Sequence, residues 1–165
     1  HLVYELNGGV NHNANPDVIT AEELPFALEI PVRDGYNFAG WYTDSKLTKA
    51  WDFNTKIKSG KTLYAKWKKI SLKQAVISKV QNVSGKKIKV TVKKVSGADG
   101  YQIQYSTKSN MKSAKTVTSS KTTTTISKLS KGKKYYVRVK AYKKDSTCKK
   151  VAGKWSKVKN LKVSK

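Results

Sequence analysis

The alternation of lysines with aliphatic residues in KKIKVTVKKV, residues 86–95, is the feature that most constrains the fold. Successive side chains of a β-strand point to opposite faces. Ile88, Val90 and Val92 can therefore enter one core together, while the alternate residues Lys87, Lys89, Thr91 and Lys93 face solvent. The solvent face of a strand explains all five lysines without any ligand.

Further short segments with strand character surround this stretch, and turn signals such as SGADG and SKGKK lie between them. Strands at this spacing predict an antiparallel sandwich. Alternation directs Tyr101, Ile103 and Tyr105 inward, and it does the same for every second residue from Tyr135 to Ala141. The segments with strand character are AVISKVQNV, YQIQYS, TTTTIS, YYVRVKAYKK and KWSKVKNLKVS.

The N-terminal part reads differently, with aromatic-rich strands expected at LVYEL, NFAGWYTD and TLYAKW. Asn7-Gly8-Gly9 follows the first of these with residues that accept positive φ. AEEL at 21–24 is expected to make one helical turn and FALEI at 26–30 a half-buried strand. The stretch 11–20 is expected to be a loop, and 47–54 a short irregular or one-turn segment.

Charge changes abruptly along the chain. Residues 1–70 hold 9 Lys and Arg against 8 Asp and Glu, whereas residues 71–165 hold 26 against 2. Such an asymmetry marks a domain boundary and indicates an anionic environment for the second half. We expect one domain at 1–69 and another at 70–165. Because the chain opens at His1 and not at Met, we expect it to be a piece of a longer protein.

The first half carries a recognisable signature: YELNGG, then GYNFAGWYTDSKLTKAWDF, then TLYAKW. Over about residues 2–68 it resembles the Listeria–Bacteroides repeat, the B-repeat of internalins and other secreted bacterial proteins. The resemblance implies a small β-grasp-like (α+β) domain with little helix, usually found in extracellular stalks.

The second half, over about residues 72–164, resembles a fibronectin type III domain. The resemblance rests on the phrase L-x-x-G-x-x-Y-x-V-x-V-x-A, which runs from Leu129 to Ala141 and places Tyr135 at the corner position. It implies an antiparallel β-sandwich, so the whole chain is expected to be mainly β. Val92 stands where an aromatic residue usually fills the core, so either Trp155 or the neighbouring tyrosines fill that volume, or the core is looser.

The lysines argue against a dedicated nucleic-acid site, which would gather Lys and Arg with exposed aromatics in one tract. Residues 71–165 contain one arginine, Arg138, and lysine is poorly suited to base recognition. Exposed tyrosines beside cations and amides can bind sugars or acidic chains, and the same residues can equally just stabilise a sheet. The candidate ligand-binding face consists of Gln102, Gln104, Tyr136, Arg138, Lys140 and Tyr142.

Catalytic chemistry is not predicted. His1 and His12 lack the spacing of a metal pair, so no metal site or cofactor is expected. Cys148, in the expected loop STCKKVAGK, has no positioned base, and Glu22-Glu23 would diverge on either a helix or a strand. The sequence contains neither a calcium loop nor a phosphate-binding glycine loop.

These observations predict a non-catalytic spacer and adhesive region of a secreted or surface protein of a Gram-positive bacterium. Its expected location is extracellular, at the cell wall, and no apolar run reaches the roughly 18 residues of a membrane helix. The expected partners are cell-wall polymers such as teichoic acids, or anionic polysaccharides of a host surface. The alternative is an accessory region of a secreted hydrolase whose catalytic domain lies outside this chain.

Overall fold

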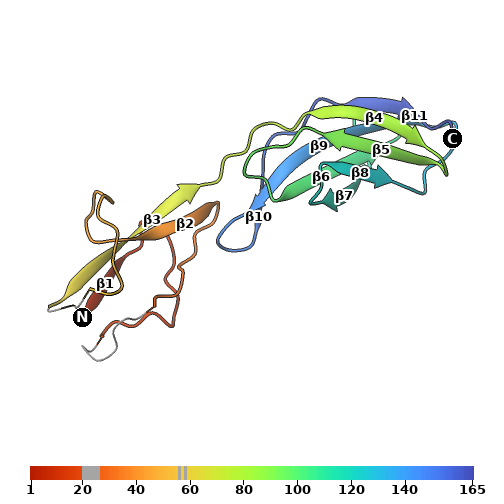
Figure 1. Ribbon diagram of the computed structural model, residues 1–165. Helices are drawn as coiled ribbons and strands as arrows, with labels where there is room; N and C mark the ends of the chain where they lie inside the picture. The colour runs from red at the N-terminus through yellow and green to blue at the C-terminus, as the bar shows by residue number, and fades with distance from the viewer. Residues whose placement is uncertain (20–26, 56, 58) are drawn as a thin grey trace. The chain divides into compact units, whose positions relative to one another are not determined.

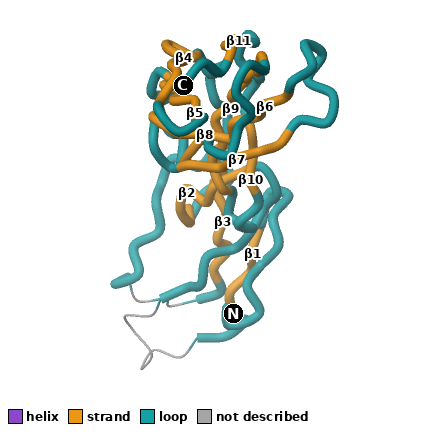
Figure 2. Tube along the Cα trace, turned by 90° about the vertical axis from the view of Figure 1, so that its right-hand side faces the viewer, coloured by secondary structure: helices purple, strands orange, loops and turns teal. Residues whose placement is uncertain are grey.

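The computed structural model describes residues 1–19, 27–55, 57 and 59–165. Within these residues the protein contains strands and loops but no helix (Figure 2). It forms two compact units, one of His1–Ile70 with Lys144–Lys149 and one of Ser71–Lys143 with Lys150–Lys165. In this described part of the chain no helix is long and apolar enough to cross a membrane.

The first unit is built on a three-stranded mixed sheet of order β1-β3-β2 (Figure 1). β3 lies in the centre, parallel to β1 and antiparallel to β2. The β-grasp assignment stays a prediction. The strands are β1 (Leu2–Glu5), β2 (Tyr36–Tyr42) and β3 (Lys61–Lys69).

Aromatic rings make up much of the core of this unit. The ring of Trp41 lies 5.3 Å from those of both Tyr4 and Phe38, and Phe38 also packs edge-on against Trp67 at 5.6 Å. Large rings of this kind give a small domain much of its buried apolar area. The buried members are Leu2, Trp41, Trp51, Leu63 and Ala65.

The half-buried strand expected at 26–30 is wrong for its described part, because residues 27–30 form no strand. The Asn15 side chain instead forms hydrogen bonds with the backbone there. Its amide donates to the Glu29 carbonyl at 3.0 Å, and its oxygen accepts from the Glu29 N–H at 2.7 Å. The helical turn expected at 21–24, Glu22-Glu23 and Phe26 lie outside the described residues.

The second unit is a sandwich of two antiparallel sheets (Figure 1). One sheet has the order β4-β5-β8 and the other β10-β9-β6-β7, with β11 also paired to β9. The strands are β4 (Ile77–Val83), β5 (Lys87–Val92), β6 (Gly100–Ser106), β7 (Lys115–Ser119), β8 (Thr123–Ile126), β9 (Lys134–Lys144), β10 (Lys150–Ala152) and β11 (Lys159–Lys162).

The core of the sandwich confirms the predicted alternation. Ile88, Val90 and Val92 are buried, whereas Lys89 and Lys93 are exposed. Tyr101 and Tyr135 are buried in this core, and Trp155 is not a member of the buried cluster. Each tyrosine hydroxyl accepts a backbone N–H bond, from Val95 at 2.9 Å and from Ser130 at 3.0 Å respectively.

Candidate functional site

The six candidate residues lie on neighbouring strands of one sheet and form the β6–β9 face: Gln102, Gln104, Tyr136, Arg138, Lys140 and Tyr142. The register of the two strands places Gln102 opposite Lys140 and Gln104 opposite Arg138. Side chains directly opposite each other in an antiparallel pair are within contact range. The structure therefore brings the amides and the cations of this face together.

Arg138 is held in place by two contacts on this face. Its Nε donates a hydrogen bond of 2.9 Å to the Gln104 side-chain oxygen, and its guanidinium carbon lies 4.4 Å from the centre of the Trp155 ring. The Lys140 ammonium lies 4.5 Å from the same ring. One indole thus attracts two cations through its ring electrons.

Trp155 was not expected on this face, and its position follows from Ser156. The buried Ser156 side chain accepts the Val139 N–H at 2.9 Å, while the Ser156 N–H donates to the Val139 carbonyl at 2.7 Å. Pairing residue 156 with residue 139 sets the preceding tryptophan beside the residues that flank Val139 on the outer face. The Trp-Ser pair in KWSKVK could have drawn attention to Trp155, but the sequence does not show that Ser156 pairs with Val139 of β9.

Tyr142 departs from its predicted environment. We expected this ring to face solvent, but the residue is only 8% exposed. The Lys150 ammonium on β10 lies 5.0 Å from the ring centre, and β10 covers this end of β9. The expectation missed β10, because residues 150–152 were assigned to a loop. The binding role of the β6–β9 face stays a prediction.

The contacts that this face offers are charge and ring contacts. Elsewhere, Cys148 is exposed, and the His12 Nδ1 accepts the Ala14 N–H at 3.2 Å. Among the residues that the structure describes, no group of three or more His, Cys, Asp or Glu side chains could hold a metal ion.

Two family models match this chain, one for each of its two unlike folds. Residues 1–66 match the Listeria-Bacteroides repeat domain, and residues 77–152 match the fibronectin type III domain. Both resemblances predicted from the sequence are confirmed. The fold and the matches define a modular, all-β arrangement in which a bacterial repeat precedes a fibronectin type III sandwich.

Relatives match over short stretches. A protein of Evansella cellulosilytica described as a Gly-rich membrane protein is 58% identical over 38 residues, which cover 22% of this chain and 4% of that protein. A second membrane protein of this organism is 38% identical over 68 residues, covering 39% of this chain and 10% of that protein. The chain thus spans a small part of either relative.

Among solved structures, the crystal structure of chicken CNTN1 FN1-FN3 domains is 20% identical to this chain, with a TM-score of 0.48. That match covers 66% of this chain and 38% of the chicken chain.

Proposed function

We propose that this chain is a non-catalytic spacer and adhesive module of a bacterial surface or secreted protein, and that its fibronectin-like unit binds anionic polymers weakly. The observation that carries the proposal is the distribution of lysines over both sheets of the sandwich. Lys89 and Lys93 are exposed with the β4-β5-β8 sheet, and Lys134 and Lys159 with the other sheet.

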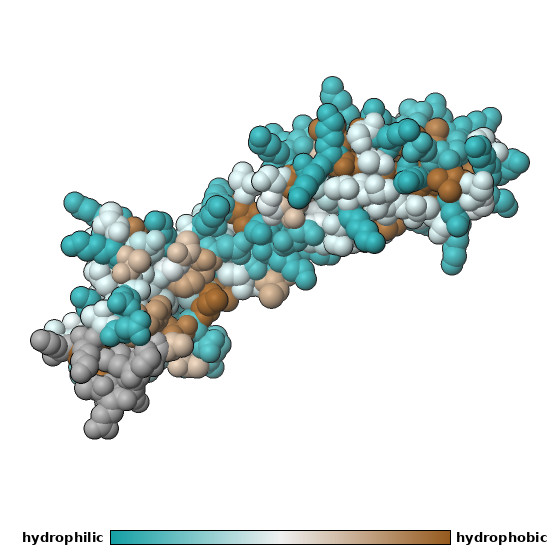
Figure 3. Space-filling model, viewed as in Figure 1, coloured by the Kyte–Doolittle hydropathy of each residue, from teal (hydrophilic) through white to brown (hydrophobic). Residues whose placement is uncertain are grey.

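Carboxylates do little to offset this charge. Residues 71–165 contain only Asp99 and Asp145. Asp99 lies 3.6 Å from the Lys143 ammonium, and the Asp145 carboxylate accepts hydrogen bonds within the segment Lys144–Lys149. Hydrophilic side chains project at many points of the visible face of the second unit, with white and brown areas between them (Figure 3).

Such a surface attracts polymers of high charge density at contact. The screening length is about 8 Å at physiological ionic strength, so dispersed small anions are attracted little. Polymers that carry many charges release counterions when they bind, which gives weak affinity and a steep dependence on salt. Several such modules in one protein would add their affinities through effective concentration.

The proposed location is the bacterial surface or the extracellular space. Two findings support it: the match to a repeat family that occurs in secreted bacterial proteins, and the Evansella relatives described as membrane proteins. Teichoic acids and glycosaminoglycans are the polymers with suitable charge density in these surroundings.

The proposal is tested by titrating the whole chain with heparin, teichoic acid and duplex DNA at low and at moderate salt, with uncharged dextran as the control. We expect all three anionic polymers to bind at low salt and to be released over the same range of salt, because charge density sets the affinity. Retention of a single polymer at roughly tenfold higher salt than the others would contradict binding by distributed charge.

A further inference from the structure

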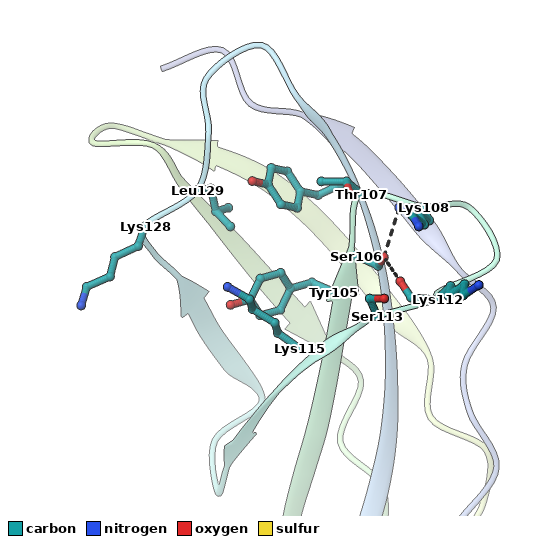
Figure 4. A pocket seen from close by; sticks show the side chains of 10 residues that line it. Tyr105, Ser106, Thr107, Lys108, Lys112, Ser113, Lys115, Lys128 and Leu129 are labelled. Atoms are coloured by element: carbon teal, nitrogen blue, oxygen red, sulfur yellow. Dashed lines mark hydrogen bonds between the residues drawn. The ribbon is translucent and has the colours of Figure 1, made fainter.

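A pocket of about 180 Å³ opens at the end of the sandwich, between the β6–β7 connection and the segment before β9 (Figure 4). It lies apart from the residues of the β6–β9 face. Four of its lining residues are lysines, and none of the described residues that line it is acidic. The lining residues are Tyr105, Ser106, Thr107, Lys108, Lys112, Ser113, Lys115, Lys128, Leu129 and Tyr135.

The pocket combines an apolar wall with a polar rim. The rings of Tyr105 and Tyr135 are tilted against each other with centres 6.3 Å apart, and Leu129 is buried beside them. In Figure 4 the Lys115 side chain runs toward Tyr105, whereas Lys128 extends away from the rings. Apolar walls with a few polar groups around them are typical of ligand sites.

The β6–β7 connection is fixed in shape by its own hydrogen bonds. The buried Ser106 hydroxyl donates to the Lys112 carbonyl at 2.7 Å and accepts the Lys108 N–H at 3.1 Å, as the dashed lines in Figure 4 show. The Met111 side chain is buried and anchors the same connection. The wall is therefore formed before any ligand arrives.

The backbone around the pocket holds three non-glycine residues in the left-handed region. Met111 and Ser113 have φ values of 61° and 56° in the β6–β7 connection, and Lys128 has a φ of 59° across the pocket. Non-glycine residues rarely adopt this conformation, and such residues are concentrated at binding sites. Two of the three, Ser113 and Lys128, line the pocket.

We propose that this pocket binds a phosphate or sulfate ester carried on a sugar or polyol unit of an anionic polymer. The inference rests on the proposed function and gives it one preferred point of contact. The volume equals that of about six water molecules, enough for an oxyanion with part of its attached unit. The lysines that line the pocket can bind a phosphate or sulfate group as point charges.

The test compares Lys115→Gln/Lys128→Gln with Lys89→Gln/Lys93→Gln, which removes the same charge from exposed positions on and beside β5. Both are made in the whole chain, and dispersed NMR spectra establish that each variant is folded. Glycerol 1-phosphate, acetate, teichoic acid and polyglutamate serve as probes. We expect glycerol 1-phosphate to give saturable shifts of the Thr107, Ser113 and Lys128 amides, which acetate does not reproduce.

We expect the pocket variant to lose these shifts and to bind teichoic acid at least about fivefold more weakly than the β5 variant does. Wild type should release polyglutamate at lower salt than teichoic acid. Absent or non-saturating shifts, or equal shifts with acetate, would overturn the proposal that this pocket binds a phosphate or sulfate ester. Equal weakening in the two variants would also overturn it and leave the proposed function standing, whereas saturable pocket shifts without any polymer binding would overturn the proposed function alone.

Discussion

At the scale of single residues, Gly9 links the two halves of the repeat signature. Its N–H donates to the Leu6 carbonyl at 2.9 Å, and the Trp67 indole N–H donates to the same oxygen at 2.8 Å. A Cβ on Gly9 would clash with the Trp67 ring. Gly9 of YELNGG thus leaves the space that the Trp67 ring of LYAKW occupies.

Gly9→Ala should lower the stability of the first unit by about 1–3 kcal/mol, because the indole must move from a packed position. Gly60→Ala is the matched control, since a Cβ there has as its nearest atom the His1 carbonyl oxygen at 3.8 Å. Urea denaturation followed by tryptophan fluorescence measures both variants. Equal stability of the two would show that Trp67 does not fix this turn.

Asp145 is the carboxylate whose ionisation matters to its segment, Lys144–Lys149. Burial favours the protonated form, but hydrogen bonds from the Gly35 N–H at 2.8 Å, the Thr147 side chain and backbone and the Lys149 N–H outweigh it. Together they lower the pKa of Asp145 from 3.8 to about 2. A carboxyl with a lowered pKa stabilises the fold fully above its unfolded pKa and loses that effect as pH falls through its folded pKa.

Asp145→Asn should therefore lower the melting temperature at pH 7 and make the loss of stability between about pH 4 and pH 2 shallower than in wild type. Asp99→Asn removes the same charge from an exposed ion pair and serves as the control. Calorimetric melts at pH 7, 4, 3 and 2 make the comparison. If the melting temperature of Asp145→Asn fell with pH as steeply as that of wild type, the stabilising role of the ionised Asp145 would be contradicted.

At the scale of elements, β5 shows that its lysines form the solvent face of a strand. Val90 is completely buried in the centre of the β4-β5-β8 sheet, and Lys89 beside it is exposed. Val90→Ala should cost about 2 kcal/mol of unfolding free energy, since it removes buried methyl groups and leaves a cavity. Lys89→Ala should stay within about 0.5 kcal/mol. Similar losses in chemical denaturation would show that the alternation does not define the core.

Most strands that the sequence predicted carry a row of aliphatic or aromatic side chains on one face, although β8, with the sequence TTTI, does not. β7 and β10 were missed because they lie at sheet edges and bury little: Val117 is half-buried in the Thr-rich β7, and β10 has three residues. Alternation placed Gln102, Gln104, Arg138 and Lys140 on one face, and the register supplied by the structure pairs them, whereas Tyr142 is buried. Trp155 and the pocket could not be found, because both depend on loops that bring distant segments together.

At the scale of the whole molecule, the two units have unlike cores, one aromatic and one aliphatic with tyrosines. We predict that residues 1–70 and 71–165 each fold when expressed alone. Each should give a dispersed NMR spectrum and a cooperative melt, because each retains its own buried cluster. Failure of both pieces to do so would contradict the two-domain account.

The central claim is that charge spread over the sandwich, and not the Arg138 and Lys140 pair of the β6–β9 face, accounts for most of the polymer binding. The most direct measurement is the affinity for duplex DNA against salt concentration, for wild type and for Arg138→Ser/Lys140→Ser. Each phosphate neutralised adds about −0.9 to the logarithmic slope, so removing two of many charges should reduce slope and affinity only in proportion. Abolition of binding by this double substitution would contradict the claim and make the β6–β9 face a discrete site.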